Sequence, residues 1–233
     1  PHPGESETAK NVLCVLGETS EIAKSHVDCN RVQDAYSIRC MPAVHGSAKS
    51  VVRQTLRTLE IEANSSTDNP LVFEDQDKVI SCGNFHGQPV AFALDAAGIA
   101  LTSLMSISER RVEKLINPAM SDLPAFLTPE GGLNSGFMIP HVVAASLVSE
   151  SKGLSHPASV DSIPTSADKE DHVSMGTIAA RQLVKIVDNL EYVLAIELLA
   201  SKQGLELLRP MKSSRQMEEF VTYLNSIEGD FND

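Results

Sequence analysis

Two polar side chains near the start of the sequence could bind and deprotonate a small molecule. Tyr36 and Arg39 lie within the segment QDAYSIR, and the three-residue step between them puts both on one face of a helical turn. An arginine can hold a carboxylate through two parallel hydrogen bonds, and a tyrosine can accept or donate a proton. Both residues could instead cap the following helix or face solvent, and the spacing alone leaves these alternatives open.

A second candidate is the segment KEDH, which contains Glu170 and Asp171. The pattern predicts that this segment opens a long helix. There the helix dipole stabilises carboxylates, and Ser166 with Glu170 resembles a capping arrangement. That structural role is sufficient by itself. The functional alternative is a Glu170 carboxylate that points into a cleft and pairs with a cationic or hydrogen-bonding ring.

The segment GNFHG, residues 83–87, precedes another long apolar pattern. Asn84 is predicted to be the N-cap of that helix, and His86 is predicted to be a packed side chain. The seven histidines show neither H-x-x-x-H nor H-E-x-x-H, so we expect no metal site. Hydrolase and nucleotide-binding motifs of the types G-x-S-x-G, P-loop and G-x-G-x-x-G are also missing from the sequence.

The elements that must position these residues are almost all helical. Apolar residues recur at three- and four-residue steps, which predicts helices at 41–63, 85–117, 137–154, 173–208 and 215–227. A short strand pair is predicted at 71–73 and 79–81, and segment 155–168 is predicted to be a long ordered loop. We therefore expect a mostly α fold, in which long helices and long ordered loops form a bundle with at most a minor strand pair. A single domain is expected over residues 1–233.

Composition narrows the classes of partner. The 233 residues are 42% hydrophobic and carry a formal net charge of −12, so we expect no nucleic-acid partner, because such a surface repels a phosphate backbone. No uninterrupted apolar run is long enough to span a bilayer, and we expect no membrane association. The four scattered cysteines are typical of reduced thiols, which predicts a cytoplasmic protein. An apolar helix at 85–117 in a chain of this size favours oligomerisation.

Several runs of sequence resemble the aromatic amino acid ammonia-lyases, and the histidine ammonia-lyases in particular. They occur in the order found in that family and lie between residues 31 and 210. They are RVQDAYSIRC (31–40), NSSTDNPLVF (64–73), GNFHGQPVA (83–91), ISERR (107–111), LPAFLTPEGGLNSGFMI (123–139), HPASVDSIPTSA (156–167) and EDHVSMG (170–176).

The resemblance implies long antiparallel helices in a homotetramer whose active sites are shared between subunits. It also implies a carbon–nitrogen lyase that converts L-histidine into trans-urocanate and ammonia, a step of histidine catabolism. The family uses a methylidene-imidazolone electrophile, formed from an Ala-Ser-Gly tripeptide that this sequence lacks. The chain therefore resembles roughly the C-terminal half of a subunit, and we expect it to be inactive on its own.

The family's site residues carry over to five positions. Arg39 matches the arginine that binds the substrate carboxylate, and Tyr36 matches the tyrosine that takes part in proton transfer. Gln33 and Phe85 match residues that line the site and pack near the electrophile. Glu170 matches the carboxylate that faces the imidazole ring of the substrate, which makes it both a cap and a site residue.

Two alternatives remain beside a histidine ammonia-lyase. A phenylalanine or tyrosine ammonia-lyase, or an aminomutase, would use the same electrophile. Phenylalanine-specific relatives tend to carry an amide near position 170, whereas a carboxylate suits a ring with N–H donors. The other alternative is a catalytically inactive helical assembly module. Asp168, Lys169 and Cys82 depart from the usual family residues, and Lys169 lies next to Glu170.

Overall fold

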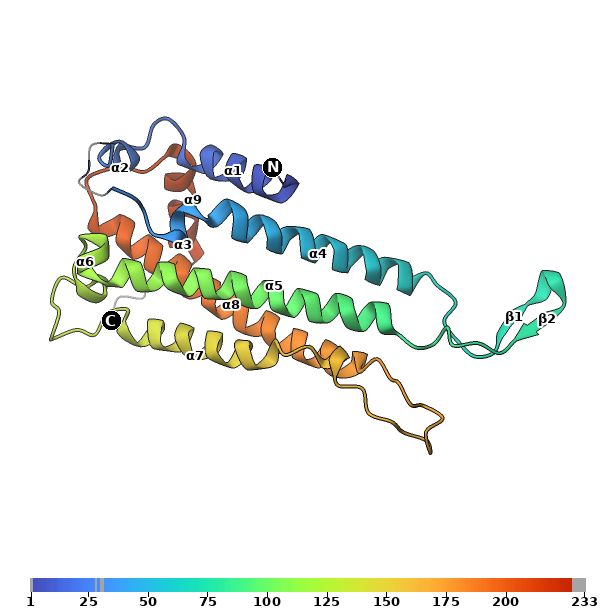
Figure 1. Ribbon diagram of the computed structural model, residues 1–233. Coiled ribbons are helices and arrows are strands. Elements are labelled where there is room, and N and C mark those ends of the chain that lie inside the picture. Colours follow the sequence, from blue (N-terminus) through green and yellow to red (C-terminus); the bar gives the residue numbers. More distant parts are fainter. Residues whose placement is uncertain (1, 28, 30–31, 228–233) are drawn as a thin grey trace. The chain divides into compact units, whose positions relative to one another are not determined.

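The computed structural model describes residues 2–27, 29 and 32–227, and Arg31 of the RVQDAYSIRC run lies outside this part of the chain. Within it the fold is mostly α, which confirms the predicted fold class (Figure 1). The long helices are α1 (Pro3–Leu16), α4 (Met41–Ala63), α5 (Gln88–Ile116), α7 (Met138–Leu154), α8 (Gly176–Leu207) and α9 (Arg215–Ile227). The shorter elements are α2 (Glu21–Lys24), α3 (Tyr36–Arg39), α6 (Pro118–Ser121), the 3-10 turns η1 (Glu74–Gln76), η2 (Ala125–Leu127) and η3 (Ala158–Val160), and the antiparallel strands β1 (Leu71–Phe73) and β2 (Lys78–Ile80).

Helix α1 was not predicted, because small residues make its closest contact. A side-chain carbon added at Gly4 would lie 2.2 Å from the carbonyl oxygen of Gly46 in α4, so the two backbones touch directly. Several apolar side chains of α1 are exposed, among them Leu13, Val15 and Leu16. A periodicity of large apolar residues therefore does not reveal this helix, although Pro3 suits its first turn.

The chain divides into two compact units whose boundaries fall inside α4, α5, α7 and α8. Unit 1 comprises the described residues up to Gly46, Met105–Ser146 and the described residues from Tyr192 onward; unit 2 comprises Ser47–Leu104 and Leu147–Glu191. The core of unit 1 is formed by Val112, Ile116, Leu123, Leu127 and Ala200. The core of unit 2 is formed by Leu94, Ala158 and Ala179, with Leu59, Val90 and Met175 packed against them.

Helix α5 contributes to both cores and has the length and apolar composition of a membrane span. It also buries polar side chains that bond to other segments. In unit 2, Asp95 is 9% exposed and accepts a hydrogen bond of 2.8 Å from the backbone N–H of Ser159. In unit 1, Ser108 and Arg111 are buried and bond to Glu197 of α8. Such internal polar partners are typical of the core helix of a folded domain.

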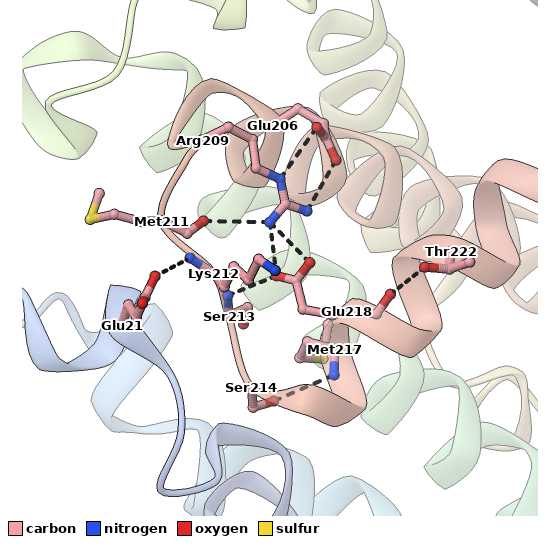
Figure 2. A network of polar contacts seen from close by, with 10 residues as sticks. All are labelled: Glu21, Glu206, Arg209, Met211, Lys212, Ser213, Ser214, Met217, Glu218 and Thr222. Atoms are coloured by element: carbon pink, nitrogen blue, oxygen red, sulfur yellow. Dashed lines mark hydrogen bonds and ion pairs between the residues drawn. The ribbon is translucent and has the colours of Figure 1, made fainter.

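In unit 1, a network of polar contacts stabilises the turn between α8 and α9 (Figure 2). The Arg209 guanidinium donates to the carboxylates of Glu206 and Glu218, and the backbone N–H of Ser213 also donates to Glu218. The backbone N–H of Lys212 donates to the Glu21 carboxylate at 2.8 Å. This ties the turn to α2, which precedes the first candidate site segment. The Arg209 hydrogen bond lowers the pKa of Glu218, and Glu206 and Glu218 together raise the pKa of Arg209.

Candidate functional site

The first candidate site is built on the single turn of α3 in unit 1. The backbone N–H groups of Arg39 and Cys40 donate to the carbonyls of Ala35 and Tyr36, at 3.0 and 2.9 Å. The guanidinium carbon of Arg39 lies 4.5 Å from the centre of the Tyr36 ring, within the range of a cation–π contact. The two side chains therefore share one face of the turn, as their spacing predicts.

This face borders a cavity of about 440 Å³ with an excess of positive charge. Gln33, Asp34, Tyr36, Arg39 and Lys114 contribute to its lining, together with Ala35, Ala119 and Met120. The lining contains two cations, Arg39 and Lys114, and one carboxylate, Asp34, although the net charge of the whole chain is −12. Tyr36 is 70% exposed, so its hydroxyl is accessible. The arrangement suits a small ligand that carries a carboxylate.

The second candidate site surrounds Glu170 in unit 2, and the structure corrects the predicted helix start. Helix α8 begins at Gly176, whereas Glu170 pairs through its backbone with Thr165 in an isolated antiparallel bridge. Three of the four intervening residues, Ser166, Ala167 and Asp168, have positive φ, so the chain makes a tight left-handed turn there. Glu170 closes this turn as a bridge residue, and the predicted role as a helix cap is wrong.

The Glu170 carboxylate is held in its ionised form. Its Oε2 accepts hydrogen bonds of 2.8 Å from the hydroxyls of Thr165 and Ser166, and these bonds lower the pKa of Glu170. Within the part of the chain that the structure describes, both bonds use Oε2, which leaves Oε1 for a ligand. An ionised carboxylate accepts hydrogen bonds and does not donate them, so its partner must be an N–H or O–H group.

Glu170 and Phe85 border one cavity of about 710 Å³. Phe85 is 57% exposed there. The rings of His86 and His172 stack with their centres 5.7 Å apart, and His86 Nε2 donates to the His172 carbonyl at 3.0 Å. His86 is therefore a packed side chain, as predicted. Asn84 does not cap α5, because its amide instead donates to the Ser66 carbonyl at 2.8 Å and α5 begins at Gln88.

The five residues predicted from the resemblance thus form two groups. Gln33, Tyr36 and Arg39 line the cavity in unit 1, and Phe85 and Glu170 line the cavity in unit 2. Sequence reasoning missed Lys114, Met120 and His172. Lys114 follows Arg39 by 75 positions, and no local spacing indicates that the two cations share a cavity.

The model of the family described as aromatic amino acid lyase matches residues 1–226. The chain belongs to the aromatic amino acid lyase family. The chain is 54% identical over 214 residues to the histidine ammonia-lyase of Myxococcus xanthus, an alignment that covers 92% of this chain and 42% of the relative. Its structure resembles the crystal structure of histidine ammonia-lyase from Trypanosoma cruzi, with a TM-score of 0.88 and 49% identity over 98% of this chain and 42% of the other.

Phenylalanine aminomutase from Pantoea agglomerans is also similar in structure to this chain. The TM-score is 0.86 and the identity 32%, over 97% of this chain and 47% of that one. The chain spans less than half the length of the curated histidine ammonia-lyases from Myxococcus xanthus, Koribacter versatilis and Sorangium cellulosum that it matches. The family resemblance inferred from the sequence runs is therefore confirmed.

Proposed function

We propose that the chain is part of a histidine ammonia-lyase, which eliminates ammonia from L-histidine to give trans-urocanate. The observation that carries this proposal is the Glu170 carboxylate at the border of a cavity, where two hydroxyls bond to Oε2 and Oε1 can accept a hydrogen bond from a ligand. An imidazole ring supplies an N–H donor to such a group, whereas a phenyl ring does not. Histidine ammonia-lyases at 54–56% identity among the relatives support the same substrate.

Each site residue has a role that follows from its chemistry. The Arg39 guanidinium would bind the substrate carboxylate through two hydrogen bonds, and the nearby Lys114 adds positive charge. The exposed Tyr36 hydroxyl would carry the proton removed from the substrate. Glu170 would fix the imidazole ring by accepting its N–H. These roles require residues of the two groups to serve one substrate, which active sites shared between copies of the chain would allow.

The methylidene-imidazolone of this family would supply an electrophile that activates the substrate for loss of ammonia. The sequence contains no Ala-Ser-Gly from which the group forms, so we propose that it comes from another part of the natural polypeptide. The residues present fit such a group. Phe85 offers an exposed aromatic ring that can pack against a flat heterocycle, and the exposed Gln33 amide can donate to a carbonyl oxygen.

We also propose a cytoplasmic homotetramer with active sites shared between subunits. Tyr36 and Phe85 support sharing, because both are more than half exposed although aromatic side chains at binding sites are usually covered. Other large apolar residues are exposed in both units, including Val142 in unit 1 and Leu56 and Ile99 in unit 2. Such residues are commonly buried when subunits associate.

The experiment that tests the substrate compares three amino acids. The intact natural gene product would be incubated with L-histidine, L-phenylalanine and L-tyrosine, and the ultraviolet spectra of the products recorded. We expect trans-urocanate from L-histidine and little product from the other two. A cinnamate or a β-amino acid as the main product would favour a phenylalanine or tyrosine enzyme, for which the 32% identity to the Pantoea aminomutase is the supporting observation. No product from any of them would favour a helical assembly module.

A further inference from the structure

The α3 turn that carries Tyr36 and Arg39 has little to hold it in place by itself. A helix of four residues is far below the length at which helices are stable alone, so tertiary contacts must fix it. Behind the turn, Ile38 borders a cavity of about 590 Å³ instead of closely packed side chains. Apolar packing on this side is therefore incomplete, and another interaction must define where the turn lies.

Arg111 of α5 supplies that interaction from within unit 1. Its Nη1 donates to the backbone carbonyl of Ser37 at 3.3 Å and to His45 Nε2 at 3.2 Å. Ser37 is buried at 9% exposure and lies between Tyr36 and Ile38 at the centre of the turn. A single guanidinium thus reaches both the turn and the first part of α4, which follows it.

Glu197 of α8 fixes the orientation of Arg111. Arg111 Nη2 donates to Glu197 Oε2 at 3.0 Å, and Nε donates to Oε1, so the pair is bidentate. The Ser108 hydroxyl donates to the same Oε2. The side chains of Arg111 and Glu197 are only 10% and 18% exposed. A planar guanidinium held on one edge by a carboxylate can present its remaining N–H groups in one direction only.

We propose that Arg111, held by Glu197, is a positioning residue for the carboxylate-binding Arg39 and for Tyr36. The pair acts through the Ser37 carbonyl and need not touch the substrate. Loss of the guanidinium releases the turn toward the cavity behind it, and Arg39 then meets a carboxylate with the wrong geometry. The part of this inference that concerns the substrate rests on the proposed function, whereas the anchoring of the turn does not.

Hydrogen exchange tests the anchor directly. In the intact natural gene product, Arg111→Gln should accelerate exchange of the Arg39 and Cys40 amides at least tenfold, because these close the turn. The single variant leaves the partly buried Glu197 carboxylate without its counter-ion, which is destabilising, so Arg111→Gln with Glu197→Gln is the second variant. It removes both charges and should show the same local acceleration.

The matched control is Arg110→Gln, on the same turn of α5. Arg110 pairs with Glu109, and its side chain is 56% exposed. The Arg110→Gln variant should therefore leave hydrogen exchange in α3 unchanged. Peptides from α9 serve as the internal reference. Unchanged exchange of α3 in the double variant, or acceleration that is equal in α3 and α9, would overturn the proposal.

Inhibitor binding separates a positioning role from a merely structural one. Imidazole-4-propionate carries a carboxylate and histamine does not. With Arg111→Lys, we expect the inhibition constant of imidazole-4-propionate to rise about tenfold and that of histamine to stay within twofold. Equal weakening of both inhibitors would contradict a role through Arg39. If the wild-type protein binds neither, the proposed function fails, and the exchange experiment still decides whether Arg111 anchors the turn.

Discussion

The direct backbone contact between α1 and α4 gives a prediction whose magnitude follows from the structure. A Cβ atom at Gly46 would lie 2.4 Å from the backbone nitrogen of Glu5 and 2.5 Å from the carbonyl carbon of Gly4. Both are backbone atoms, so no side chain can rotate away and α1 must move. Such overpacking costs about 3 kcal/mol. Gly→Ala inside a helix stabilises the helix by about 1 kcal/mol. We therefore expect Gly46→Ala to lower the local stability of α1 against α4 by about 2 kcal/mol.

Hydrogen exchange of a peptide from α1 measures this loss locally. A loss of about 2 kcal/mol corresponds to exchange that is roughly 30-fold faster. The matched control is Gly153→Ala in α7, where an added Cβ meets nothing within 4 Å. That variant should slow local exchange, because alanine is the better helix former. If Gly46→Ala behaves like Gly153→Ala, the close contact between α1 and α4 does not exist and the reasoning is refuted.

Three further outcomes are expected. Arg39→Ala should raise the KM for L-histidine about ten- to hundredfold, since hydrogen bonds to charged groups contribute about 1.5–3 kcal/mol; an unchanged KM would exclude Arg39 as the carboxylate ligand. The Arg209 hydrogen bond lowers the pKa of Glu218, so its contribution to stability is complete above the ordinary value of 4.5 and is lost as the pH falls through the lower folded value. Urea unfolding would be measured between about pH 3 and 6, the range in which carboxylates titrate. The free energy of unfolding should fall with decreasing pH in the wild type, and should fall less in Arg209→Gln. Ser166→Ala removes a hydrogen bond that lowers the pKa of Glu170, so the acidic limb of the kcat/KM profile for histidine should move to higher pH, and an unmoved limb would argue against Glu170 as the ring acceptor.

The long helices could be predicted from the sequence because their burial follows a regular period. The bounds of α4 and α9 agree with the predicted ranges 41–63 and 215–227, and α5, α7 and α8 begin slightly later than expected. The start of α8 was misplaced because the acidic pattern at Glu170 is equally compatible with a helix cap and a turn. The backbone bridge between Thr165 and Glu170 closes a turn, and this bridge decides between the turn and the helix cap.

The candidate site was only partly predictable, for a related reason. Tyr36 and Arg39 are neighbours on one turn, so their spacing alone brings them together. Lys114 enters the same cavity through the tertiary fold, and Arg111 reaches Ser37 across 74 positions of sequence. Interactions of this kind leave no periodic trace. The roles assigned to these residues by family resemblance remain predictions until variants are assayed.

The central claim is tested most directly by one assay of the intact natural gene product with L-histidine, in which ammonia and trans-urocanate are measured together. The account predicts that both appear in equal amounts, and that Arg39→Ala loses most of this activity at a subsaturating histidine concentration. The account would be contradicted if the wild type formed neither ammonia nor trans-urocanate, or if Arg39→Ala formed both as fast as the wild type.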